Sequence, residues 1–188
     1  MGGKGEGTLK LLWKEVVMVQ QVVRPPDAVL LRPVQLADAP ALRQNCWPHR
    51  SPQQVTRLLQ QAEYLARQER GLGAVAVLEE EVCGFGLLTL YPRAAEISDL
   101  IVSPSRRGQG IGTALIVHLT QEAQRLGVTT LEIGVAQSNP RARALYQRLG
   151  FVETRSVQID LGEGPEMVLY LAKSLETPPS HQLPALPR

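Results

Sequence analysis

The residues best suited to chemistry in this sequence form a glycine-rich loop that follows a short apolar run and precedes an amphipathic stretch. Glycine alternates with other residues at Gly108, Gly110 and Gly112, directly after Arg106 and Arg107. A helix that begins here leaves the N–H groups of its first turn without intrahelical partners, and glycines leave those groups unshielded. The positive end of the helix dipole and the two arginines add to their attraction for anions. The loop therefore predicts a binding site for a phosphate or pyrophosphate.

The spacing of the glycines narrows the choice of phosphorylated ligand. A dinucleotide-binding loop requires Gly-x-Gly-x-x-Gly, but Thr113 stands three residues after Gly110. A Walker loop requires Gly-Lys-Ser or Gly-Lys-Thr, and the sequence contains neither. The remaining run, Arg107-Gly108-Gln109-Gly110-Ile111-Gly112, resembles the Gln/Arg-x-x-Gly-x-Gly/Ala signature of the GNAT superfamily of N-acetyltransferases. The resemblance implies that its backbone amides hold the pyrophosphate of acetyl-coenzyme A (acetyl-CoA); a glycine-rich turn without a ligand is the alternative.

A second segment points to the same family. Residues 129–136 are rich in β-branched side chains and predict a strand. Asn139 and Pro140 are suited to cap and begin a helix, and Gly150 is suited to end it. The run that begins at Asn139, Asn-Pro-Arg-Ala-Arg-Ala-Leu-Tyr-Gln-Arg-Leu-Gly-Phe, resembles the second GNAT motif. Asn139 and Tyr146 are nearly two helical turns apart, so their side chains can flank one ligand.

The resemblance implies a role for each matching position. The residues that would bind acetyl-CoA are Leu100, Val102, Arg107, Gly108, Gln109, Gly110, Gly112, Thr113, Asn139 and Tyr146. The backbones of Leu100 and Val102 would contact the pantetheine and the thioester, and an amide there would stabilise the oxyanion. Tyr146 matches the tyrosine that serves the family as general acid toward the departing thiolate. The alternative for Tyr146 is a core side chain on the apolar face of its helix.

Acyl transfer to an amine also needs a group that removes a proton, because a lysine-type amine has a pKa of about 10.4. Glu96 lies eleven residues before Arg107, at the position of the general-base glutamate in histone-type GNAT enzymes, and the resemblance nominates it. A solvated or substrate-orienting carboxylate is the alternative, with deprotonation through water. The strand period of two places Asp99 on the face opposite Glu96. Glu132 is a second candidate for the base.

The rest of the sequence predicts the elements that position these residues. Strands are expected at 29–33, 73–80, 82–91, 94–102, 129–136, 151–161 and 167–171. Helices are expected at 51–70, 111–126 and 139–150, and a further helix begins within residues 37–40. We therefore expect an α/β fold of the GNAT type, a mixed and splayed central sheet of about seven strands flanked by about four helices.

The domain organisation follows from composition. Residues 28–173 are expected to form one GNAT domain in this chain of 188 residues, 44% of them hydrophobic. Residues 1–27 are an N-terminal extension, either a further helix or an early gene start, and the Pro-rich residues 174–188 are expected to be a disordered tail. Cys46 and Cys83 lack metal-like spacing, so we expect free thiols, no metal and a cytoplasmic location.

Net charge and hydropathy limit the classes of partner that this protein is expected to bind. A formal net charge of +2, scattered along the chain, argues against nucleic acid. No apolar run reaches the roughly 20 residues that cross a bilayer, and the start of the chain lacks the features of a signal peptide. We therefore expect neither nucleic acid nor membrane as a partner.

These observations predict an acetyl-CoA-dependent N-acetyltransferase that acts on a primary amine by direct transfer in a ternary complex. The alternative is a catalytically silent acyl-CoA-binding sensor or interaction module of the same fold. The acceptor can be a small-molecule amine or a peptide or protein amine. The sequence also leaves open whether the acyl group is longer than acetyl and whether the protein forms a homodimer. His49 lies in the loop where GNAT domains build the acceptor pocket, or else is a surface histidine. Gly134 stands where ribosomal-protein N-terminal acetyltransferases carry a glutamate, which disfavours that branch.

Overall fold

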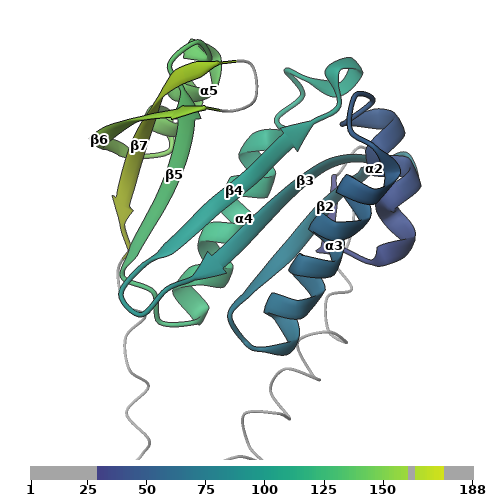
Figure 1. Cartoon of the computed structure of the whole chain (residues 1–188). Helices are drawn as coiled ribbons and strands as arrows, with labels where there is room; N and C mark the ends of the chain where they lie inside the picture. The colour runs from purple at the N-terminus through teal and green to yellow at the C-terminus, as the bar shows by residue number, and fades with distance from the viewer. Residues whose placement is uncertain (1–28, 161–163, 176–188) are drawn as a thin grey trace, which may run out of the picture.

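The computed structural model describes residues 29–160 and 164–175, which form a mixed sheet with helices on both faces (Figure 1). The strands of the described part are β1 (Leu30–Pro33), β2 (Gly71–Leu78), β3 (Glu81–Leu90), β4 (Ala95–Val102), β5 (Thr130–Ala136), β6 (Val152–Asp160) and β7 (Pro165–Ser174). The helices are α2 (Ala39–Asn45), α3 (Pro52–Arg67), α4 (Ile111–Arg125) and α5 (Pro140–Arg148), with short 3₁₀ helices η1 (Leu36–Asp38) and η2 (Pro104–Arg106). The expected N-terminal extension 1–27 and the tail from residue 176 onward lie outside the described residues.

The sheet has the order β1-β2-β3-β4-β5-β7-β6, and every neighbouring pair is antiparallel except β4 and β5. These two strands pair in parallel only from Ala95 to Ile97 on β4 and from Leu131 to Ile133 on β5. Beyond that point they diverge, as Figure 1 shows. The mixed, splayed sheet of seven strands with four flanking helices in the described residues confirms the predicted fold.

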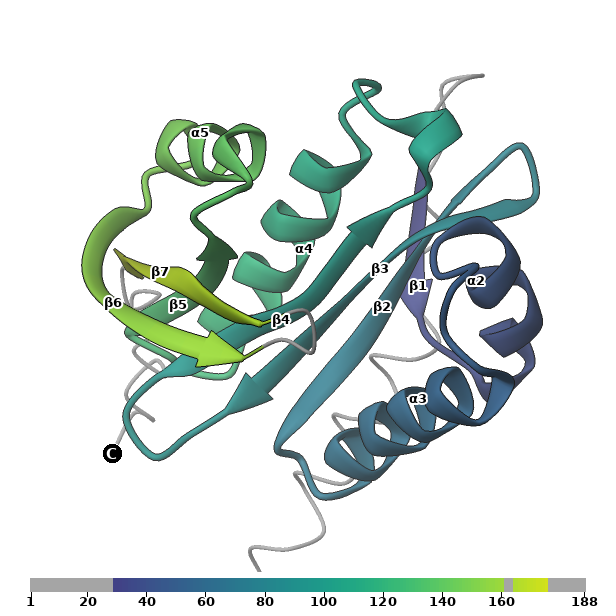
Figure 2. The same cartoon turned by 45° about the horizontal axis from the view of Figure 1, so that its top comes forward.

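Helices α2 and α3 cover one face of the sheet, and α4 covers the other (Figure 2). Helix α3 begins at a capping box, in which the Ser51 hydroxyl accepts from the Gln54 amide and the Gln54 side chain accepts from the Ser51 amide. One stripe of α3 is buried: Val55, Leu59, Ala62 and Leu65. The helix ends at Arg67, before the expected residue 70, and Glu69 has a left-handed φ of 55° that stops further helical turns.

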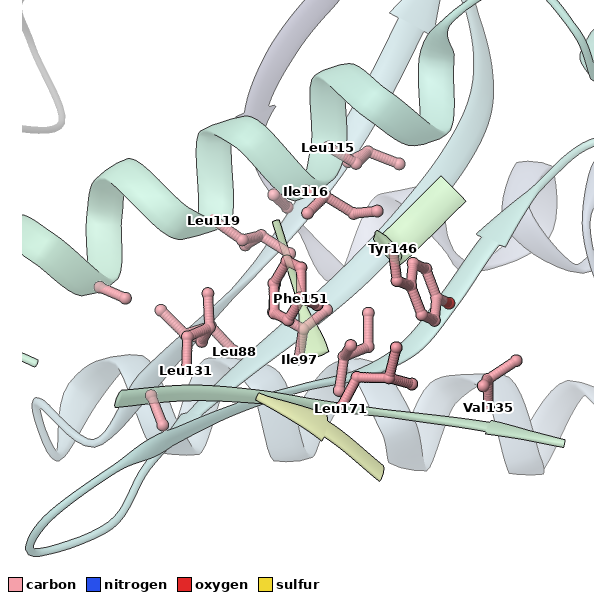
Figure 3. Packing of buried hydrophobic residues seen from close by; sticks show 14 of the residues in the cluster. Leu88, Ile97, Leu115, Ile116, Leu119, Leu131, Val135, Tyr146, Phe151 and Leu171 are labelled. Carbon is pink, nitrogen blue, oxygen red and sulfur yellow. The ribbon is translucent and has the colours of Figure 1, made fainter. Parts of the chain in front are cut away.

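The apolar stripe of α4 packs on the other face of the sheet. Leu115 and Leu119 are fully buried there against Ile97, Leu131 and Leu171 from three different strands (Figure 3). Burial of each such side chain stabilises the fold by roughly 1.5–3 kcal/mol. This packing holds the N-terminus of α4, with its glycine loop, at the diverging end of β4.

A β-bulge in β4 overturns the expected orientation of Asp99. Phe85 of β3 pairs with Ile101, but Leu87 pairs with Ser98, so Asp99 and Leu100 together oppose one residue of β3. Asp99 has a left-handed φ of 50°. The extra residue breaks the alternation of faces, and Asp99 contacts Arg50 from the α2–α3 loop, on the same side of the sheet as Glu96 and Ser98. The prediction that Asp99 faces away from Glu96 was therefore wrong.

The last strand is longer than expected. β7 continues to Ser174 because it pairs with the whole of β5, from Ala136 opposite Val168 to Thr130 opposite Ser174. Leu175 is buried against the α4 side of the core, two residues beyond the predicted end of the domain at residue 173. Cys46 and Cys83 are free and buried. Among the described residues, none of the helices is long and apolar enough to span a membrane.

Candidate active site

A cleft of about 460 Å³ lies at the diverging end of β4, between the glycine loop and α5. It brings together most of the residues predicted to bind acetyl-CoA. Those that line it are Leu100 and Val102 from β4, Arg107, Gly108, Gly110, Gly112 and Thr113 from the loop and α4, and Asn139 and Tyr146 from α5. Gln109 and Glu96 are not among its lining residues.

The conformation of the loop accounts for two of its glycines. Gly108 and Gly110 have left-handed φ values of 84° and 81°, which side chains rarely adopt. Gly112 is different, because a Cβ there would lie 3.6 Å from Leu145 and 3.7 Å from Val102, at ordinary contact distance. Local packing therefore does not require glycine at position 112. A ligand that closely approaches the first turn of α4 would require glycine at this position.

The positive charge near the loop is arranged differently from the sequence expectation. Arg106 is 2.9 Å from Glu79 and 3.0 Å from Glu81, at the tip of the β2–β3 hairpin. Arg106 also lines the cleft, but those carboxylates largely neutralise it, so it is less available to a phosphate than the sequence predicts. Arg107, which also lines the cleft, donates through Nε to the Val102 carbonyl at 3.2 Å.

Helix α5 supplies further cations. Arg141 lines the cleft, and a Cβ on Gly108 would lie 3.5 Å from its guanidinium. Arg143 instead forms an ion pair with Glu153 on β6 at 2.5 Å. Arg148 also lines the cleft and was not predicted. It lies seven residues after Arg141, on the same face of α5, and that spacing is the signal that could have found it.

Asn139 is fixed by the start of α5. Its side-chain oxygen accepts a hydrogen bond from the Ala142 amide at 3.1 Å, and Pro140 follows at the first helical position. This cap directs α5 along the cleft, which places Asn139 and Tyr146 at two points of the same wall.

Tyr146 is 5% exposed and packs against Phe151, with ring centroids 6.4 Å apart. Its ring joins the apolar cluster, and its hydroxyl oxygen points away from Phe151 (Figure 3). The hydroxyl makes no hydrogen bond to another described residue, and Tyr146 lines the cleft. Burial raises the pKa of Tyr146 to about 12. The side chain is therefore a protonated donor at neutral pH.

The face of the sheet away from α4 carries the carboxylates nominated as bases. Glu96 and Glu132 are neighbours in register on the parallel strands β4 and β5. The Tyr91 hydroxyl donates to Glu96 at 3.3 Å, while Glu132 is 3.1 Å from the Arg155 guanidinium. Partial burial and the neighbouring Glu96 carboxylate raise the pKa of Tyr91. Glu96 thus lies close to the divergence of the strands, on the face opposite α4.

The loop between α2 and α3 reaches the same face. Arg50 lies over the Trp47 ring, 4.7 Å from its centroid, and 3.4 Å from Asp99. The sequence drew attention to His49 in this loop, but the contact with β4 comes from its neighbour Arg50. No local pattern could have found this contact, because it depends on the bulge at Asp99. Among the described residues, no group of three or more His, Cys, Asp or Glu side chains is arranged to hold a metal ion.

Sequence comparisons identify the family of this chain and several relatives. A family model described as Acetyltransferase (GNAT) family matches residues 36–151. The [ribosomal protein bS18]-alanine N-acetyltransferase of Escherichia coli K12 is 35% identical over 85 residues, 45% of this chain and 57% of the relative. This chain therefore matches little more than half the length of that relative. The L-2,4-diaminobutyric acid acetyltransferase of Nocardia farcinica is 31% identical over 146 residues, 73% of this chain and 74% of the relative.

Solved structures share the fold. The crystal structure of the ribosomal-protein-S18-alanine N-acetyltransferase from Escherichia coli superposes with a TM-score of 0.64 at 24% identity, over 83% of this chain and 99% of the other. A protein from Salmonella typhimurium solved with its cofactor acetyl-CoA also has a TM-score of 0.64, at 19% identity, over 79% of this chain and 95% of the other. The family match covers more than half of the chain, and the sheet and motifs agree with it. The chain belongs to the GNAT family of acetyltransferases.

Proposed function

We propose that this protein transfers the acetyl group of acetyl-CoA to a primary amine by direct transfer in a ternary complex. The observation that carries the proposal is the cleft, which joins an unshielded helix N-terminus to a protonated tyrosine hydroxyl. A Cβ at Gly110 would meet nothing within 4 Å, so the loop leaves room for a bulky anion above the first turn of α4. Acetyl-CoA would supply the thioester and the thiolate leaving group.

Each end of the cleft has a role in binding. Backbone amides from Gly108 to Thr113 would hold the pyrophosphate, with Arg141 beside them. Backbone groups of Leu100 and Val102 would hold the pantetheine and orient the thioester. An amide at this point of β4 would also stabilise the oxyanion that develops on the carbonyl.

The chemical step needs a base on one side and a donor on the other. The amine nitrogen forms a bond to the carbonyl carbon while the carbon–sulfur bond breaks. Glu96, on the acceptor side of the sheet, would take the proton of the amine directly or through water. Tyr146 would donate a hydrogen bond to the departing sulfur.

Of the two named relatives, one acts on the alanine of ribosomal protein bS18 and the other on L-2,4-diaminobutyric acid. The first keeps the ribosomal-protein branch open, although Gly134 disfavours it. Glycine at position 134 offers no carboxylate. Glu96 and Glu132 are the carboxylates on the face proposed to bind the acceptor. The cytoplasmic location and a homodimer stay predictions.

The test is a screen of amines with acetyl-CoA, in which the reaction is monitored by the release of free thiol and the products are identified by mass spectrometry. Calorimetry with acetyl-CoA runs in parallel. We expect binding of acetyl-CoA together with acetylation of at least one class of amine. Tight binding without acetylation of any amine would instead favour the silent acyl-CoA sensor of the same fold.

A further inference from the structure

Two arginines flank the point where β4 and β5 diverge, on the face opposite α4, and each is held by an aromatic ring and a carboxylate. Arg155 of β6 lies 3.9 Å from the centroid of Tyr170 and 3.1 Å from Glu132. On the other side, Arg50 is stacked on Trp47 and paired with Asp99. A guanidinium stacked on a ring and tied to a carboxylate loses little further freedom when it binds a ligand.

The ring that holds Arg155 lies beside Gly134. A Cβ at Gly134 would lie 3.5 Å from the ring of Tyr170, an ordinary contact distance, so the ring lies next to β5 at this position. Arg155, paired with Tyr170 across β6 and β7, places its guanidinium over that ring. Gly134 is the first residue of β5 beyond its pairing with β4. The guanidinium is therefore held at the start of the divergence, next to the proposed acceptor side.

Within the described part of the chain, two of the three carboxylates on this face are paired with an arginine, and the third is not. Glu132 is neutralised by Arg155 and Asp99 by Arg50. Among the residues the structure describes, Glu96 has only the Tyr91 hydroxyl as partner and no cation within ion-pair distance. The guanidinium of Arg155 has five N–H donors, more than one carboxylate oxygen can use. The face thus presents one uncompensated carboxylate beside one cation with donors to spare.

Resting on the function proposed above, we propose that the acceptor is a small aminocarboxylate, whose carboxylate binds Arg155 while its amine lies at Glu96. Glu132, which contacts Arg155, is the in-register neighbour of Glu96 on the adjacent strand. Neighbouring strands are about 4.8 Å apart. The two charges of the acceptor must therefore lie within a few ångströms of each other, as in an amino acid with a short spacer. The N-terminal amine of an alanyl peptide, or of any peptide without an acidic first residue, carries no carboxylate at that spacing.

The experiment compares acids with their amides. Glycine, β-alanine and γ-aminobutyrate are each assayed against the corresponding carboxamide, together with an alanyl peptide amide, by thiol release from acetyl-CoA. We expect the best acid to exceed its amide in kcat/KM on the order of tenfold to a hundredfold, the range for a hydrogen bond to a charged group. Arg155→Gln should abolish that preference without changing the KM for acetyl-CoA, and Arg155→Lys should restore part of it.

Arg125→Gln is the matched control, because Arg125 is also paired with a glutamate, at 2.6 Å, but lies in the last turn of α4. It should keep the preference of the wild type. Equal rates for acid and amide in the wild type, or a preference for the peptide amide, would overturn the inference and leave the acetyltransferase function standing. Binding of acetyl-CoA without acetylation of any amine would instead refute the proposed function.

Discussion

Replacing Tyr146 by Phe separates the packing of its ring from the chemistry of its hydroxyl. Tyr146 is 5% exposed, and its ring centroid lies 6.4 Å from that of Phe151, so phenylalanine keeps the ring's contacts. The hydroxyl belongs to the cleft and makes no hydrogen bond to another described residue. Its removal therefore leaves no buried partner unpaired, and the melting temperature should change little.

The expected loss of rate follows from the pKa of the hydroxyl. Burial raises the pKa of Tyr146 to about 12, whereas a thiol has a pKa of about 8.5. Complete proton transfer from the phenol to the departing thiolate is therefore uphill. What the hydroxyl can supply is a hydrogen bond to a charged sulfur, worth about 1.5–3 kcal/mol. Its loss should lower kcat roughly tenfold to 150-fold.

The assay is steady-state thiol release with an accepted amine, with calorimetry of acetyl-CoA as the control. The Kd for acetyl-CoA should stay within about twofold, because the hydroxyl acts mainly on the charge that develops as the sulfur leaves. An unchanged kcat would show that Tyr146 is structural and that the thiolate leaves unaided. A loss of about 10⁴-fold in a folded variant would contradict the hydrogen-bond reasoning and point to full general-acid catalysis.

Three further substitutions test the cofactor loop, the base and an ion pair of the fold. Gly112→Val should weaken acetyl-CoA binding about a hundredfold or more in a protein that still folds, because the Cβ itself would have neighbours only at 3.6 and 3.7 Å; an unchanged Kd in calorimetry would remove the pyrophosphate site. Glu96→Gln should lower kcat/KM by about 10²–10⁴-fold at neutral pH. The difference from the wild type should shrink toward a pH of about 10, because the acceptor is then already deprotonated when it binds. Wild-type rates at neutral pH would exclude Glu96 as the base. Burial opposes ionisation of Asp38, but the hydrogen bonds from Arg32 and the Gln35 amide outweigh it and lower its pKa. Asp38→Asn should therefore lower the melting temperature at pH 7, and the difference should shrink as the pH falls below about 4, where the wild type loses the same charge; a constant difference at all pH values would contradict the ion pair.

The sequence by itself determined the features that depend on neighbours along the chain. The left-handed conformations of Gly108 and Gly110, the Asn139 cap with Pro140 and the capping box at Ser51 all arise within a few residues. Backbone sterics and local hydrogen bonds govern such features, so residue type and spacing are enough to predict them. Most of the cleft proposed to bind acetyl-CoA was predictable for the same reason, because two local motifs build most of its lining.

The arrangement of the face proposed to bind the acceptor was decided by tertiary structure alone. The bulge at Asp99 depends on how β4 pairs with β3, and it reversed the side of the sheet on which Asp99 lies. Arg106 was expected at the phosphate, yet the hairpin tip of β2 and β3 brings two glutamates against it. Arg155 of β6 reaches Glu132 of β5 across the Tyr170 ring of β7, the strand that lies between them. Each of these contacts joins residues distant in sequence. Their free energy depends on strand register and packing, which no local pattern records.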